Sequence, residues 1–241
     1  MTNQKERIVV AVDGLSATGK TTLARMLANQ LDFCCLHTGL LYRAVAFLVM
    51  SSSIKDLQNT PEIMLLLAQH KIEPCDGRVQ DSAVLIDGKC ISQELKSVQV
   101  SEMTSKLSAL PEVRQALFEM QRNAFAGKNI VAEGRDMGTV IFPDAQVKFF
   151  VEASPIVRAQ RRLQELQQAK VDSEANQLDL LEKSIEKEIQ ERDQRDQSRL
   201  ISPAIPAQDA IVIDNSSETL TQVVEKMYVP CAKLVGCTRI L

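Results

Sequence analysis

Residues 14–21 of this 241-residue chain read Gly14-Leu-Ser-Ala-Thr-Gly19-Lys20-Thr21. The octapeptide matches G-x-x-x-x-G-K-[ST], a loop whose backbone N–H groups surround phosphate oxygens. It stands between a β-branched run at Ile8–Val12 and apolar residues at helical spacing over Thr21–Leu31, which is the strand–loop–helix setting that the motif requires. A tight turn joining strand to helix would explain the two glycines, but not a lysine followed by a threonine. The motif therefore predicts a nucleotide site.

The expected contacts with the nucleotide follow from the chemistry of this loop. Gly14 and Gly19 let N–H groups turn inward, and the next helix presents the positive end of its dipole. Lys20 brings a positive charge to the β- and γ-phosphates of the nucleotide, and the Thr21 hydroxyl is a ligand for Mg²⁺. The predicted nucleotide-binding residues are Gly14, Leu15, Ser16, Ala17, Thr18, Gly19, Lys20, Thr21 and Thr22.

Strand and helix patterns alternate along the rest of the chain. Short apolar runs predict buried strands, and longer stretches with apolar residues three and four apart predict helices. The expected strands lie at 33–36, 129–132, 147–151 and 211–213, and the expected helices at 39–50, 97–107, 111–126, from 155, and at 178–200, with a loop at 172–177. The alternation predicts an α/β fold in three layers, a parallel sheet with helices on both faces.

The pattern changes between the second helix and residue 97. A helix opens at Thr60-Pro61, and short strands are expected at 71–73, 78–86 and 90–92. Asp76-Gly77 and Asp87-Gly88 separate them, and such dipeptides are typical of tight hairpins. We predict a small antiparallel insertion at about 60–107 in a single domain over 1–229, whose core is 1–59 and 108–229; residues 230–241 are expected to form a tail.

Composition excludes several classes of protein. The net charge of −3, with two tyrosines and no tryptophan, argues against a nucleic-acid binder. Six cysteines without a C-x-x-C pair and two histidines argue against zinc and favour free thiols in a reducing compartment. The N-terminal apolar run is too short for a signal peptide, and no stretch approaches a membrane span. We expect a cytoplasmic protein that does not bind membranes, and a monomer.

A P-loop leaves the use of the nucleotide open. The chain has no N-K-x-D run for reading guanine, and a small-molecule kinase with a positively charged acceptor site is the simplest class. Arginines follow two predicted strands, in the segments Thr38–Arg43 and Glu133–Asp136. Such an arginine could hold a phosphate together with backbone N–H groups, although Arg43 could equally be a solvated side chain.

Charge is concentrated again in QERDQRDQSR, residues 190–199, inside the last long predicted helix. At 100° per residue, Arg192, Asp196 and Arg199 fall on one stripe. A surface ladder of salt bridges would show the same spacing. The segment follows a second arginine group within 158–162, and a kinase needs planar, bidentate donors around the migrating phosphoryl group, so we interpret the stripe as part of a substrate pocket.

The chain resembles bacterial cytidylate kinases from Ile8 to about Lys226. Besides the P-loop, the resemblance rests on Thr38-Gly-Leu-Leu-Tyr-Arg43, on Glu133-Gly-Arg-Asp-Met-Gly-Thr-Val-Ile-Phe-Pro-Asp144 and on Glu191-Arg-Asp-Gln-Arg-Asp-Gln-Ser-Arg199. It implies a P-loop kinase fold with a monophosphate-binding insertion and a helical lid at about 155–178. It also implies transfer of the γ-phosphoryl group of ATP to CMP and dCMP with Mg²⁺.

The resemblance assigns roles to individual residues. Thr38, Arg43, Arg135 and Arg199 would hold the acceptor phosphate. Ser105, Arg114 and Asp136 would read the cytosine edge, and Arg192 and Asp196 would bind the ribose. Arg158 and Arg162 would belong to the lid over ATP, with Arg161 as an alternative. The implied catalytic residues are Lys20, Arg135, Arg158, Arg162 and Arg199.

Four positions depart from the family pattern. Leu15 and Thr18 differ within the P-loop, and with both glycines retained we expect the loop to tolerate them. His37 and Glu133 stand where the family usually has aspartate. A histidine beside the acceptor could make CMP affinity pH-dependent, which equal affinity at about pH 6 and pH 8 would contradict, or it could face solvent.

Two rival classes remain open at this point. Another small-molecule P-loop kinase, such as one acting on dephospho-coenzyme A or shikimate, would have no need of the hairpin insertion or of the arginine stripe. A module that hydrolyses or senses ATP without an acceptor would release ADP whether or not a monophosphate is present.

Overall fold

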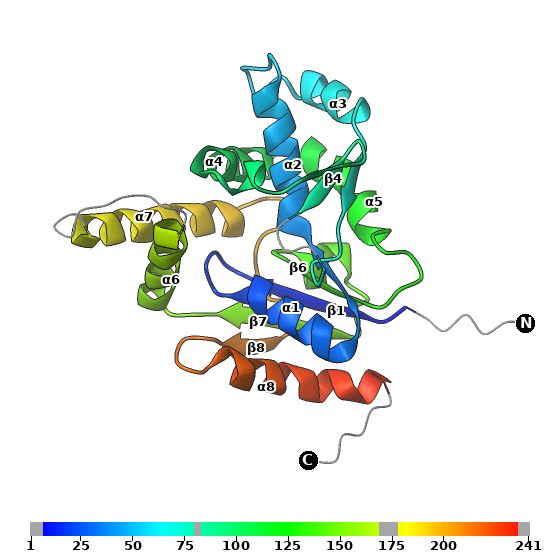
Figure 1. The fold of residues 1–241 in the computed structure, drawn as a ribbon, viewed down its shortest axis with the longest axis vertical. Helices are drawn as coiled ribbons and strands as arrows, with labels where there is room; N and C mark the ends of the chain where they lie inside the picture. The colour runs from blue at the N-terminus through cyan, green and yellow to red at the C-terminus, as the bar shows by residue number, and fades with distance from the viewer. Residues whose placement is uncertain (1–6, 80–82, 169–177, 236–241) are drawn as a thin grey trace, which may run out of the picture.

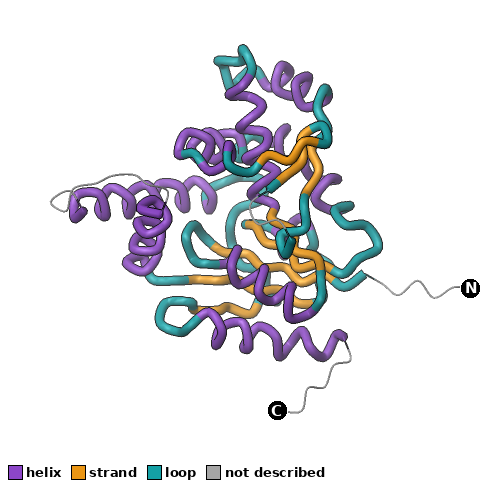
Figure 2. Tube along the Cα trace, in the orientation of Figure 1, coloured by secondary structure: helices purple, strands orange, loops and turns teal. Residues whose placement is uncertain are grey.

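A five-stranded parallel sheet forms the centre of the protein. The computed structural model describes residues 7–79, 83–168 and 178–235. The strand order is β2-β6-β1-β7-β8, with β1 paired to β6 on one side and to β7 on the other (Figures 1 and 2). Strand bounds are β1 (Val9–Gly14), β2 (Cys34–His37), β6 (Ile130–Gly134), β7 (Val147–Glu152) and β8 (Ile211–Asp214). The expected three-layer α/β fold is confirmed.

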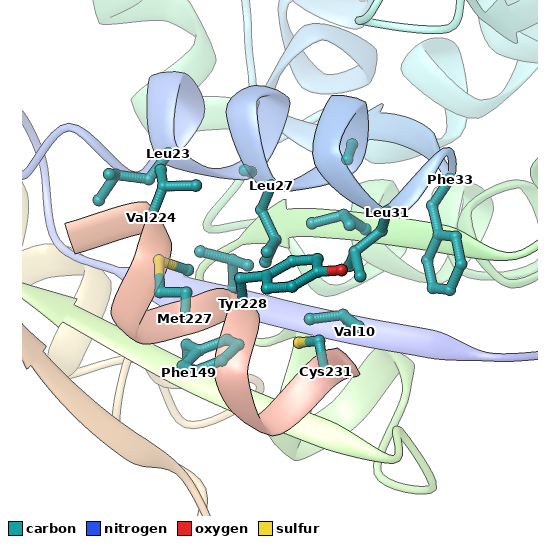
Figure 3. Close-up of a cluster of buried hydrophobic side chains, with 14 of the residues drawn as sticks. Val10, Leu23, Leu27, Leu31, Phe33, Phe149, Val224, Met227, Tyr228 and Cys231 are labelled. Carbon is teal, nitrogen blue, oxygen red and sulfur yellow. The ribbon is translucent and has the colours of Figure 1, made fainter. Parts of the chain in front are cut away.

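Helices α1 (Lys20–Leu31) and α8 (Leu220–Ala232) cover one face of the sheet. Leu27 of α1 and Met227 of α8 meet Phe149 of β7 in a fully buried cluster (Figure 3). A capping box, Thr219 with Gln222, starts α8.

Helix α8 continues past the boundary expected between residues 229 and 230. Pro230 lies inside the last turn, and Cys231 is 1% exposed in the core cluster beside Tyr228. A short turn, Lys233–Val235, follows. The expected tail therefore begins later than Pro230, because the burial of Cys231 keeps the chain helical where a proline alone suggests an end.

The opposite face is covered by three elements, α2 (Thr38–Ser51), α5 (Pro111–Arg122) and a single π-helical turn at Met137–Ile141. Asp13 at the end of β1 accepts hydrogen bonds from the N–H groups of Met137 and Gly138, both at 2.8 Å. This carboxylate fixes the segment after β6 directly against the start of the P-loop. The motif at 133–144 is thereby held beside the nucleotide loop.

The predicted insertion contains an antiparallel sheet flanked by helices, and its elements pack mainly on α2. Its elements are α3 (Thr60–Ala68), β3 (Ile72–Pro74), β4 (Val84–Ile86), β5 (Lys89–Ile91), a short 3-10 turn (Glu94–Lys96) and α4 (Val98–Leu107). The strand expected from residue 78 begins only at Val84, because Arg78 is held in a turn by Asp76 and Asp32. Part of that expected strand, 80–82, lies outside the described residues.

Helices α6 (Pro155–Gln168) and α7 (Leu178–Gln197) pack against each other through Ala159, Ile185 and Ile189. Figure 1 shows the pair projecting from one end of the sheet, beside the P-loop. The loop expected at 172–177 lies outside the described residues. No helix among the described residues is long and apolar enough to span a membrane.

Candidate active site

The P-loop needs glycine at its two ends for steric reasons. A Cβ on Gly14 would lie 2.3 Å from the carbonyl oxygen of Val151, and one on Gly19 would lie 2.6 Å from Nδ2 of Asn215. Gly19 also has a φ of +85°, the left-handed region that disfavours other residues. The loop is therefore closely packed on β7 and on the segment after β8.

Lys20 is buried and folds back over the loop. Its Nζ donates a hydrogen bond of 2.9 Å to the carbonyl oxygen of Leu15. Burial lowers the pKa of Lys20 to about 7, and the positive charge of Arg135 adds to this effect. An anion placed beside Lys20 would reverse both effects, so the site electrostatically favours phosphate.

A cavity of about 710 Å³ opens in front of the P-loop. It lies where the loop, the ends of β2 and β6, the insertion and α7 meet. Most of the predicted residues line it: Ser16, Ala17, Gly19, Lys20, Thr21, Thr22, Thr38, Arg43, Arg114, Arg135, Asp136, Arg162, Arg192, Asp196 and Arg199. Residues from six segments of the sequence thus share one cavity.

Five predicted residues are absent from this lining. Gly14, Leu15 and Thr18 support the loop from behind; the Thr18 hydroxyl, for example, donates to the Leu15 carbonyl oxygen at 3.1 Å. Ser105 is 4% exposed, and its hydroxyl has no hydrogen-bond partner among the described residues, whereas Thr104 and Ser108 of the same region line the cavity. The fifth is Arg158, which contacts the P-loop backbone.

Helix α7 ends at Gln197, short of the expected residue 200, so Arg192 and Asp196 lie on it and Arg199 lies just after its end. All three line the cavity, so a surface ladder of salt bridges is the wrong interpretation. Asp196 is 2% exposed and accepts from Arg135 Nε at 3.0 Å and from Arg199. Burial alone would raise the pKa of Asp196, but Arg135, Arg199 and Arg192 lower it overall. Burial, together with the nearby positive charges of Arg135, Arg43 and Arg162, lowers the pKa of Arg192 to about 10.

A second buried ion pair closes the cavity on the side of α5. Arg114 donates to Asp136 and to the carbonyl oxygen of Ser108, and its guanidinium lies 5.4 Å from the centre of the Tyr42 ring. Asp136 follows β6, so the pair joins the parallel sheet to α5. An aromatic ring and a buried ion pair together suit a flat polar ring such as a nucleobase.

Arg43 is held at the opening of the cavity by a hydrogen bond of 2.6 Å from its Nη1 to the carbonyl oxygen of Leu95. It is half-buried, so the solvated interpretation is wrong. Thr38 is buried, and its hydroxyl donates to the carbonyl oxygen of Glu133 at 2.8 Å, which joins the ends of β2 and β6.

The three arginines of α6 divide their contacts. Arg158 pairs with Asp193 and donates to the Ser16 carbonyl oxygen. Arg161 donates to the carbonyl oxygens of Thr18 and Asn215, at 3.2 and 2.7 Å. Arg162 lines the cavity and pairs with the exposed Glu165. Of the two lid residues expected, Arg162 is the one that faces the cavity.

His37 is buried, which excludes the solvent-facing alternative. It is 4% exposed, with Nδ1 3.4 Å from Glu133 Oε1 and Nε2 3.5 Å from Cys35 Sγ. Burial lowers its pKa, but the contacts with Cys35 and Glu133 outweigh burial and raise the pKa to about 10. A pKa this far above neutrality predicts a charged imidazole at both about pH 6 and about pH 8, and therefore an affinity for the acceptor that His37 does not change between these pH values.

This shift gives stability a defined pH dependence. The unfolded imidazole titrates near 6.5 and the folded one near 10, so the stabilisation is fully present below pH 6.5 and is lost as pH rises through 10. We expect the difference in free energy of unfolding between wild type and His37→Gln to be larger at about pH 6 than at about pH 9.5. Urea denaturation at both pH values measures it, and a difference that grows with pH would contradict the charged pair.

The turn of the insertion covers His37. Gly77 N–H donates to the Cys35 carbonyl oxygen at 2.9 Å, and Asp76 Oδ1 accepts from the Cys35 N–H at 2.9 Å. A Cβ on Gly77 would lie 2.0 Å from His37 Nε2. The turn of the insertion is therefore attached to the edge strand β2 at a position where a side chain larger than that of glycine would meet His37.

We expect Gly77→Ala to destabilise the protein by about 1–3 kcal/mol, because the methyl group forces the turn away from a buried side chain. Gly39→Ala is the matched control, since a Cβ there meets nothing within 4 Å. Chemical denaturation of both variants checks this. Equal stability of the two would show that the turn can move without loss.

The sequence analysis did not predict two contacts at the site, those of Asp193 and of Cys35. Asp193 lies three residues before Asp196 in the same charged segment and is 5% exposed, yet its partners are Ser16 and Arg158. Cys35 was expected only as a thiol, and it contacts His37. Its position one helical turn before Asp196 is the sequence signal that could have identified Asp193.

Comparisons with known proteins agree with the geometry. The family model described as cytidylate kinase matches residues 10–232. A cytidylate kinase of Marinomonas sp. (strain MWYL1) is 39% identical over 93% of this chain and 96% of its own length. One of Vibrio parahaemolyticus is 41% identical over 90% of this chain and 92% of its own. The chain belongs to the cytidylate kinase family.

Proposed function

We propose that the protein transfers the γ-phosphoryl group of ATP to CMP and to dCMP, producing ADP and the corresponding diphosphate. The observation that carries this proposal is a set of buried guanidinium donors without acceptors. The Nε atoms of Arg114, Arg192 and Arg199 are buried and have no hydrogen-bond partner among the described residues. All three line the cavity in front of the P-loop. Unpaired buried donors are costly, and an anionic ligand would satisfy them.

The acceptor would bind in the arginine-lined part of the cavity. Arg43, Arg135 and Arg199 would hold its phosphate, and Asp196 and Arg192 would bind the ribose hydroxyls. Arg114 and Asp136 would read the cytosine edge beside Tyr42, and Thr104 and Ser108 line the same wall. In this arrangement residues 60–107 would form the monophosphate-binding unit, and the segment at about 155–178, which begins with α6, would form the lid.

The chemistry needs little beyond alignment. The attacking atom is a phosphate oxygen that is already anionic near neutral pH, so no general base is needed. Lys20, Arg135 and Arg162 line the cavity and would stabilise charge on the transferring group. Catalysis then rests on holding the two phosphates in line within a cavity that excludes water.

The exposed Thr21 lines the cavity at the first turn of α1, and its hydroxyl would hold Mg²⁺ together with ATP. When bound, the ion would supply positive charge against the phosphates. We also propose a cytoplasmic monomer; the buried thiols of Cys34, Cys35 and Cys231 support a reducing compartment.

The acceptor dependence of ADP release tests the proposal. We expect rapid ADP release from ATP and Mg²⁺ with CMP or dCMP, slower release with UMP, and background release with AMP, GMP or no acceptor. Release at one rate regardless of the acceptor would instead indicate an ATP-hydrolysing module. Fast release with a purine monophosphate alone would contradict the assignment of Arg114 and Asp136.

A further inference from the structure

Ser16, in the middle of the P-loop, is held by three separate side chains. Its N–H donates to Asp193 Oδ1 at 3.0 Å, and its carbonyl oxygen accepts from Arg158 Nη1 at 3.2 Å. Its hydroxyl accepts from Arg135 Nη2 at 3.1 Å. The N–H, the carbonyl oxygen and the hydroxyl of Ser16 are therefore bound by α7, by α6 and by the segment after β6, respectively.

Asp193 is the centre of this arrangement. One carboxylate oxygen accepts from Ser16 and the other from Arg158, which itself donates to Ser16. The three residues form a closed ring of hydrogen bonds in which Asp193 and Arg158 are 5% and 7% exposed. Because a buried charged pair holds a fixed geometry, the ring fixes the P-loop backbone relative to α6 and α7.

The same helix also carries the acceptor side of the site. Asp196 lies one turn beyond Asp193 and accepts from Arg135, which contacts Ser16 as well. Two buried carboxylates of α7 thus make contacts on different sides of the cavity: Asp193 at the nucleotide loop and Asp196 at the proposed acceptor pocket. A shift of α7 moves both, so the alignment of donor and acceptor depends on each contact.

We propose that Asp193 is a positioning residue for phosphoryl transfer, which acts through Arg158 and the backbone of Ser16 without touching either substrate. The proposal rests on the function proposed above. It moves Arg158 from the group that contacts ATP to the group that sets the position of the loop, in agreement with its absence from the cavity lining.

The test compares two variants of α7 that each remove one carboxylate. Asp193→Asn retains an oxygen for the Ser16 N–H but loses the charge that orients Arg158. Glu191→Gln is the matched control, because the Glu191 side chain is 59% exposed and lies 3.9 Å from Lys187. We expect kcat of Asp193→Asn to fall about 10- to 100-fold below that of the control, with the Kd of CMP unchanged within about twofold.

Arg158→Lys tests the same ring of hydrogen bonds from its other charged member, since an ammonium group keeps the charge but cannot reproduce the planar guanidinium contact. It should lower kcat in the same way, and the double variant should be no slower than the slower single variant, because the two residues act as a unit. Asp193→Glu should recover part of the lost turnover.

Several results would overturn the proposal. They are turnover of Asp193→Asn equal to that of Glu191→Gln, a loss of CMP affinity that matches the loss of kcat, and rate losses that multiply in the double variant. If Asp193→Asn does not fold, turnover of Arg158→Lys equal to that of wild type would by itself overturn the proposal. CMP-dependent ADP release by the wild type is measured alongside, and its absence would count against the proposed function instead.

Discussion

Arg199→Ala should retain the fold and lose about 10²–10³ in turnover with CMP, the loss found when one donor to a developing negative charge is removed. The Arg199 side chain is 7% exposed, its Nη2 donates to Ser108 Oγ at 3.0 Å and to Asp196, and its Nε has no partner among the described residues. The fold should survive because Asp196 keeps its contact with Arg135 at 3.0 Å. Steady-state kinetics with saturating ATP measure the loss.

Arg195→Ala is the matched control for this variant. It lies four residues earlier, in the last turn of α7, is exposed, and donates to the backbone oxygen of Glu191 at 3.2 Å. Turnover of Arg195→Ala should equal that of wild type. If Arg199→Ala also matched wild type with CMP, the assignment of the α7 stripe to the acceptor pocket would be wrong.

The largest effect on stability is expected at the buried pair of Arg114 and Asp136. Arg114→Met leaves the Asp136 carboxylate, which is 2% exposed, without its charged partner. Breaking a buried pair by removing one member destabilises a protein by about 3–5 kcal/mol. We expect a loss of this size in urea denaturation, together with loss of CMP turnover.

The double variant Arg114→Met/Asp136→Leu separates the two effects. Replacing both members of a buried pair by apolar residues leaves no unpaired charge, so most of the stability should return. CMP turnover should stay low, because the groups proposed to read cytosine are gone. Recovery of turnover with stability would show that the pair is structural and that the base is read elsewhere.

The sequence predicted the fold well because its signals are local. The P-loop, the apolar strands and the Asp-Gly turns each depend on neighbours in the chain, and all lie near their expected places. The differences occur where tertiary contacts override local preference. Cys231 keeps α8 helical beyond Pro230, and the ion pairs of Arg78 keep a turn where β-branched residues suggested a strand.

The sequence predicted which residues line the cavity better than it predicted the contacts that they make. Helical spacing placed Arg192, Asp196 and Arg199 on one stripe, but whether that stripe faces water or a cavity depends on how α7 packs. The same limit applies to Arg158, Arg161 and Arg162, which share one face of α6. Their distances from the P-loop follow from the packing of α6 on α7, which no local pattern specifies.

Contacts between distant segments were the hardest to anticipate. His37 is buried because Gly77, forty residues further along the chain, covers it, and Glu133 of another strand lies against its ring. Asp193 reaches a loop 177 positions away in sequence. Such contacts have no periodicity, so a single sequence does not reveal them.

The fate of the γ-phosphoryl group tests the account most directly. The wild-type protein is incubated with γ-³²P-labelled ATP, Mg²⁺ and CMP, and the labelled products are separated. We predict that the label appears in CDP and that no label is transferred when CMP is omitted. Label found only in inorganic phosphate, at a rate independent of CMP, would contradict a kinase whose arginine-lined cavity holds the acceptor.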